Sequence, residues 1–282
     1  MRNPAEGGGI PMSRLLKRIA LLFFAFIAVL AAAIYLLYFR RAALPRAAPH
    51  ARAVPVISTI PGLSACWVET AKTFSSFSFG LTAGSILVKH PAGDLLIDTG
   101  SSSQYDREIS GFPFRTWFKL KSLAGQLKPK VSLPDREELQ FAANPSVRAG
   151  GYVIAAPTLR FEPTPYVTFD ESTDLYGDGS VVVVPLRGHT PGSVGIFLNL
   201  SPTLRLFYVG DAVDEERGFE ERVGKSLLLR DSDNDAPLAN QIVGQLSELH
   251  EKVPELAIVP AHGRSAYKKF FPSGPLSCVS RP

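Results

Sequence analysis

Cysteine is scarce in this chain of 282 residues, which has only Cys66 and Cys278. One disulfide is therefore the most that it can form. The pair lies near the two ends of the part that follows the N-terminal apolar run, which suits a disulfide if this part lies outside the cytoplasm. Two unpaired, partly buried thiols fit the same spacing equally well. No internal repeat or low-complexity tract is present either.

Basic charge is also missing where a nucleic-acid-binding face would need it. The pI of 9.1 comes from the N-terminus, because residues 1–46 contain seven Lys or Arg and one acid, Glu6. Residues 47–282 contain 23 basic and 25 acidic side chains and are slightly acidic. The sequence therefore argues against a nucleic-acid partner.

Charged residues are absent from Ile19 to Phe39, a run of 21 residues. A helix of that length crosses a ~30 Å hydrocarbon core, so we expect a single membrane-spanning helix. A cleaved signal peptide is the alternative, although its apolar region normally has about 7–15 residues. The expected order is a cytoplasmic tail over residues 1–18, the transmembrane helix over 19–39, a linker rich in Ala, Pro and Arg over 40–56, and one domain over 57–282. Basic residues flank the helix on both sides, and we place the domain outside the cytoplasm.

Short strands and a few helices are expected in this domain. The expected strands include "SACWVET", "GSILVKH", "DLLIDTG", "GYVIA", "PYVTF", "SVVVVPL", "SVGIFLNL", "RLFYVGD" and "ELAIVPAHG". Residues 101–127 suggest two short helices, and "DAPLANQIVGQLSELHEK" places its apolar residues on one helical face behind an Asp cap. His90 is expected to be exposed in a hairpin turn, and His250 to lie on the helix surface. This order of elements predicts a layered domain of mixed α and β structure.

Three residues that can bind a metal share the same kind of position. His189, Asp211 and His262 each follow an apolar strand directly. Side chains placed at strand ends converge if the strands lie side by side. One lone histidine in a turn is more often structural, so the hypothesis depends on all three residues together.

The motifs "LLIDTG", "DLYGDGSVVVVPLRGHTPGS", "FYVGDAV" and "VPAHG", in this order, resemble the metallo-β-lactamase superfamily. The resemblance implies an αββα four-layer sandwich with up to two zinc ions at one edge. It implies His189 as a ligand of the first metal, His262 of the second, and Asp211 as the bridging and catalytic carboxylate. Asp98 and Thr190 would lie beside these ligands and orient them.

The family's His-x-His-x-Asp-His motif does not occur, because no histidine lies between Gly100 and Gly188. Four of the family's seven metal ligands are therefore missing, and one weak zinc site or none is expected. "KVSLPD" resembles the run into the missing strand, and "REELQFAANP" resembles a helix well beyond it. We expect an internal deletion near Asp135–Arg136 that also removes a core strand.

The resemblance implies a hydrolase that cleaves a lactone or ester bond in a small molecule with metal-activated water, and the apolar run implies that it is anchored in a membrane. The missing ligands leave a second hypothesis open. In that hypothesis the chain is a non-catalytic binding or scaffold module of the same fold, or an internally deleted gene product.

Overall fold

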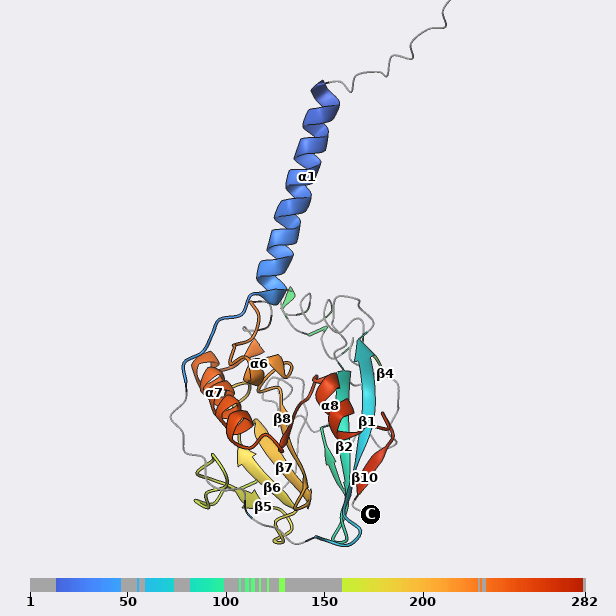
Figure 1. Ribbon diagram of the computed structural model, residues 1–282, viewed down its shortest axis with the longest axis vertical. Helices are drawn as coiled ribbons and strands as arrows, with labels where there is room; N and C mark the ends of the chain where they lie inside the picture. The colour runs from blue at the N-terminus through green and yellow to red at the C-terminus, as the bar shows by residue number, and fades with distance from the viewer. Residues whose placement is uncertain are drawn as a thin grey trace, which may run out of the picture.

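The computed structural model describes residues 14–46, 55, 59–73, 82–98, 107, 110–111, 113–114, 117, 121, 127–129, 159–227, 229 and 232–280. A long N-terminal helix stands clear of a domain that contains two β-sheets (Figure 1). The helix α1 (Arg14–Ile34) continues as a π-helical turn, η1 (Tyr35–Phe39). Residues Leu16–Leu37 are long and apolar enough to cross a membrane, and the domain buries none of this helix.

The first sheet is antiparallel and has the order β10-β1-β2-β3, with β4 paired to β1. Its strands are β1 (Ser64–Thr73), β2 (Thr82–Lys89), β3 (Leu95–Ile97), β4 (Leu127–Pro129) and β10 (Cys278–Ser280). Cys66 and Cys278 are direct partners across β1 and β10, and they form a disulfide. Of the two alternatives that the sequence left open, the structure thus has the disulfide.

The second sheet has the order β5-β6-β7-β8-β9. Its strands are β5 (Thr173–Asp174), β6 (Val181–Pro185), β7 (Val194–Ser201), β8 (Leu204–Gly210) and β9 (Ala257–Pro260). Neighbouring strands are antiparallel except β8 and β9, which are parallel. Consequently β6, β8 and β9 all run in the same direction and end at the same edge of the sheet.

The helices α6 (Arg217–Glu220), α7 (Ala236–Lys252) and α8 (Arg264–Phe270) accompany the strands of the domain. Asp235 caps the beginning of α7, and its side chain accepts a hydrogen bond from the backbone N–H of Leu238. A carboxylate at this position satisfies one of the free N–H groups of the first turn. The predicted helix and its Asp cap are both confirmed.

One hydrophobic core lies between the two sheets, and a second lies between the second sheet and α7. Alternate residues of β8 serve the two cores, since Leu206 and Tyr208 belong to the first and Phe207 and Val209 to the second. This follows from the period of two in a strand, and it explains why the strands of the second sheet are apolar on both faces.

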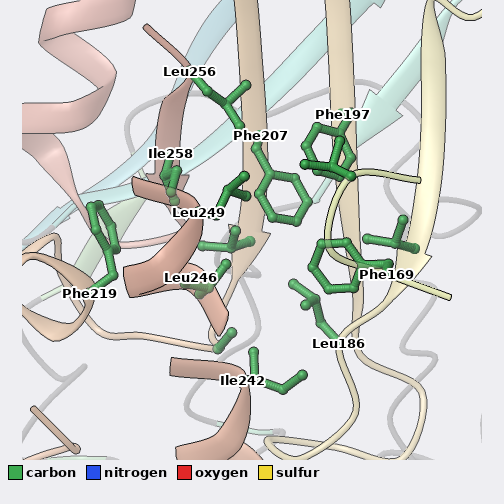
Figure 2. Packing of buried hydrophobic residues seen from close by; sticks show 14 of the residues in the cluster. Phe169, Leu186, Phe197, Phe207, Phe219, Ile242, Leu246, Leu249, Leu256 and Ile258 are labelled. Carbon is green, nitrogen blue, oxygen red and sulfur yellow. The ribbon is translucent and has the colours of Figure 1, made fainter. Parts of the chain in front are cut away.

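The second core is built around stacked aromatic rings (Figure 2). The rings of Phe197 and Phe207, from neighbouring strands, lie 3.8 Å apart between centroids. Ile242, Leu246 and Leu249 of α7 pack against the same core. This contact fixes the beginning of α7, which adjoins the loop carrying His189, with respect to the sheet.

The expectation of a mixed α and β domain is confirmed, and two local predictions are wrong. "PYVTF" forms a tight turn closed by the Tyr166–Phe169 bridge, with Val167 at a φ of 52°, instead of a strand. His90 is buried, because its ring stacks on Tyr176 and its Nε2 pairs with Asp178.

Three other sequence predictions lie mostly or wholly outside the described residues. They are the two helices of residues 101–127, the strand "GYVIA", and the deletion near Asp135–Arg136 with its missing core strand. The fourth layer of the sandwich and the deletion therefore stay predictions.

Candidate active site

His189, Asp211 and His262 lie at one edge of the second sheet. They follow β6, β8 and β9 respectively, the three strands that end at this edge. The Asp211 carboxylate lies between the two rings: its Oδ1 is 3.1 Å from Nε2 of His262, and its Oδ2 is 3.8 Å from Nε2 of His189. The structure thus brings together the three residues that the sequence singled out.

This site is open to solvent. The side chain of Asp211 is 41% exposed, and that of His262 is 39% exposed. Desolvation would raise the pKa of Asp211, but His262, and after it His189 and Lys225, outweigh this effect and hold the pKa far below its usual value. Asp211 is therefore ionised at neutral pH, with its charge directed to the place where the two imidazoles meet.

Two further charged residues, Lys225 and Asp233, contact His189 at Nδ1, the ring nitrogen that does not face Asp211. Nδ1 of His189 lies 2.9 Å from Oδ1 of Asp233, and Nζ of Lys225 lies 2.5 Å from the same oxygen. The ammonium group also donates to the backbone oxygen of Asp211 at 2.8 Å. Both side chains are only 6% exposed. Burial would raise the pKa of Asp233, but the hydrogen bond from His189 and the charge of Lys225 lower it.

Asp233 therefore determines how His189 is presented. If Nδ1–H donates to this carboxylate, the lone pair of Nε2 is left free on the side that faces Asp211. Neither Lys225 nor Asp233 could be predicted as a site residue from the sequence. The only signal is the acidic run "DSDND" before α7, which contains no ligand spacing.

The loop of His189 is fastened to the beginning of α7. The backbone oxygens of Gly188 and His189 accept hydrogen bonds of 2.9 Å from the N–H groups of Asp235 and Asn234. Gly188 has a φ of 142°, and a Cβ on it would lie 2.6 Å from the backbone nitrogen of Ala239. Only glycine fits here, because the loop and the helix backbone are in direct contact.

We expect Gly188→Ala to lower the free energy of unfolding by more than the ~1–3 kcal/mol that an unfavourable φ alone costs. The extra loss comes from the clash with α7. The matched control is Gly93→Ala, since Gly93 has a similar φ of 137° and open space around it. Urea unfolding of the two variants separates strain from contact, and equal losses would contradict the account.

Asp98 and Thr190 each make a side-chain hydrogen bond with a residue of the second sheet or of its loops. Oδ2 of Asp98 accepts a hydrogen bond of 2.6 Å from the hydroxyl of Tyr208, whose pKa is raised well above its usual value by burial and then by the charge of Asp98. Asp98 has a left-handed φ of 62°. The hydroxyl of Thr190 lies 2.8 Å from that of Ser193, which closes the turn after His189. The orienting roles expected of Asp98 and Thr190 stay predictions.

The donors suit zinc in kind but not in number. Zinc binds imidazole nitrogen and carboxylate oxygen, and a catalytic site needs about three protein ligands on one ion. Each oxygen of Asp211 faces one histidine, and in the described part of the chain no three His, Cys, Asp or Glu side chains are grouped to hold one ion. These residues alone do not complete a metal site.

Asp233→Asn is expected to lower whatever affinity the site has for zinc by about 10–100-fold, the usual cost of losing the carboxylate behind a ligating histidine. The control is Asp235→Asn two residues later, where asparagine caps the helix as well as aspartate does. Competition with a zinc chelator measures both. Equal affinities in the two variants would contradict the role of Asp233.

No protein-family model matches the chain, and no curated protein matches it. Among solved structures, an N-acyl homoserine lactone hydrolase with the product N-hexanoyl-L-homoserine at its catalytic metal centre aligns over 76% of this chain and 97% of its own, with a TM-score of 0.46 and 14% identity. A B. thuringiensis enzyme variant with N-decanoyl-L-homoserine at its active site aligns over 76% of this chain and 97% of its own, with a TM-score of 0.46 and 13% identity. A quorum-quenching N-acyl homoserine lactone lactonase aligns over 77% of this chain and 97% of its own, with a TM-score of 0.43 and 12% identity. Likeness at these scores assigns no function, which has to come from the chain's own residues.

Proposed function

We propose that this protein is a membrane-anchored, zinc-dependent hydrolase of the metallo-β-lactamase fold that opens a lactone or ester bond in a small molecule. The observation that carries the proposal is the meeting of His189, Asp211 and His262 at one sheet edge, with Asp233 behind His189. The sequence motifs that surround these residues resemble the same superfamily, and they support the same assignment.

Each residue has a part in the proposed chemistry. Nε2 of His189 and of His262 and the Asp211 carboxylate would contribute to a weak metal site, and a metal bound there would supply hydroxide near neutral pH by lowering the pKa of bound water. Asp211 is a weak base because its pKa is low, so we assign it to holding charge and orienting water instead of storing a proton. Lys225 fixes the backbone at Asp211 and neutralises Asp233.

A panel of lactones and esters tests this proposal with the full chain purified in detergent. We expect hydrolysis of at least one compound. EDTA should lower the rate by ~90% or more, and added zinc should restore it, as metal-activated water requires. His189→Ala should show no such activity. Failure to hydrolyse any compound while zinc is bound would overturn the enzyme and leave the non-catalytic binding module.

We also propose that α1 is an uncleaved, single-pass anchor with the domain outside the cytoplasm. The helix has no charged residue after Arg18 and is not covered by the domain, and the disulfide suits an oxidising compartment. Membrane pellets washed with alkaline carbonate should retain the chain, and its intact mass should include residues 19–39. A mature chain that begins beyond residue 39 would show that the helix is a signal peptide.

A further inference from the structure

The residues that directly follow the N-terminal helix are bound to the domain. The linker expected over residues 40–56 begins with a short segment, which we call the juxtamembrane strap (residues 41–44). Ala43 forms a β-bridge with Val223, and the backbone around it makes hydrogen bonds of 3.0 Å and 2.9 Å with Arg222 and Gly224. Leu44 packs against the hydrophobic core beneath α7.

Arg41 connects this strap to the turn that follows Asp211. Its guanidinium lies 2.8 Å from a carboxylate oxygen of Glu215 and 3.6 Å from one of Asp214. The Arg41 side chain is only 8% exposed, so its guanidinium meets the two carboxylates in a largely buried place. Burial raises the pKa of Asp214, while Lys225 and Arg41 lower it. Without Arg41, the turn would hold a buried acid with less compensation.

The strap therefore contacts two segments that adjoin the candidate site in the sequence. Asp214 and Glu215 come three and four residues after Asp211. Val223 and Gly224, which pair with the strap, come directly before Lys225, whose ammonium contacts Asp211 and lies 3.2 Å from Nδ1 of His189. One residue, Arg40, lies between Phe39 and Arg41, so their Cα atoms are at most ~7 Å apart. Figure 1 shows α6, which follows this turn, beside the lower end of α1.

We propose that the strap holds the candidate site against the bilayer surface, so that the site takes amphiphilic substrates whose acyl chain stays in the lipid. This inference rests on the proposed function and on α1 as a membrane anchor. The partner surface is thus the lipid headgroup layer, and the substrate class is a lactone or ester with a long acyl chain. The opposite end of β8, at the turn of residues 202–203, lies about 25 Å away from Asp211 along the strand.

Fluorescence quenching tests the placement of the site independently of any activity. Glu220→Cys puts a thiol on α6, and Thr203→Cys puts one at the far end of β8; both positions are exposed. The native cysteines are in a disulfide, so a bimane label reacts with the new thiol alone. In nanodiscs with a quencher on the lipid headgroups, the label at position 220 should lose most of its fluorescence and the label at position 203 should keep it. Equal quenching at both positions would overturn the inference.

A spacer tests the substrate class. Inserting twelve Gly and Ser residues between Arg40 and Arg41 keeps the strap on the domain but lets the domain move ~20 Å from the membrane. In nanodiscs, the native chain should prefer a dodecanoyl over a butanoyl ester by roughly tenfold or more, through the raised local concentration of the substrate in lipid. The spacer variant should lose this preference and keep its rate on the butanoyl ester.

The outcomes separate this inference from the proposed function. Hydrolysis of both esters with the same preference in the two chains would overturn the inference and leave the hydrolase intact. Hydrolysis of neither ester would overturn the proposed hydrolase, and the quenching result would still decide whether the site faces the bilayer.

Discussion

His262→Ala is expected to lower lactone or ester hydrolysis by more than the ~10–100-fold that is lost with an outer-sphere partner of a metal ligand. Nε2 of His262 lies 3.1 Å from Asp211, and it is the largest favourable influence on the charge of that carboxylate. Its removal takes away one of the three donors and loosens Asp211. The measurement is kcat/KM for the most reactive compound of the panel, with the full chain in detergent.

His250→Ala is the matched control for this loss. His250 lies on α7 with its ring 5.2 Å from that of Phe219, and its chemistry is the same as that of His262. Hydrolysis should change little in this variant. A similar loss in both variants would show that the effect comes from the fold, and an unchanged rate in His262→Ala would remove the residue from the site.

Loss of the disulfide should have the largest effect on stability. The bond joins residues that are 212 positions apart, and the chain-entropy relation for so long a loop gives about 5 kcal/mol. Because measured values are often smaller, Cys66→Ser with Cys278→Ser should lower the free energy of unfolding by about 3–5 kcal/mol. Such a loss is a large part of the ~5–15 kcal/mol that stabilises a typical domain.

Urea unfolding followed by tryptophan fluorescence measures this loss, since Trp67 is fully buried beside Cys66 and stacks on Tyr267. Wild-type protein treated with a reductant should match the double variant, and the reductant should not affect the variant further. A difference below ~1 kcal/mol between the two chains would mean that the β1–β10 pairing holds the C-terminus without the bond.

The sequence could predict the strands and the convergence of the site because both follow from local patterns. Apolar runs such as "SVVVV" and "RLFYV" are long enough to be strands. A metal-capable residue just after each run lies at the sheet edge once the strands have the same direction. Asp235 likewise predicts the beginning of α7, since a capping carboxylate before an apolar helical face is a local signal.

Contacts between distant segments could not be predicted in the same way. Arg41 and Glu215 are 174 positions apart, and nothing in the Ala- and Pro-rich linker indicates that it pairs with an acidic turn. His90 was expected to be exposed because it lies in a turn, but Tyr176 from another loop covers it. Lys225 and Asp233 likewise become functional candidates only when both meet His189 in space.

Zinc stoichiometry in matched variants tests most directly whether imidazoles 189 and 262 act with carboxylate 211 as one site. The full chain, at equilibrium with an excess of zinc, is measured against a variant with His189→Ala and His262→Ala, and against one with His90→Ala and His250→Ala. The account predicts close to one zinc per chain in the native protein and in the second variant, and almost none in the first. Less than about a tenth of an equivalent in the native chain, or equal amounts in all three, would contradict it.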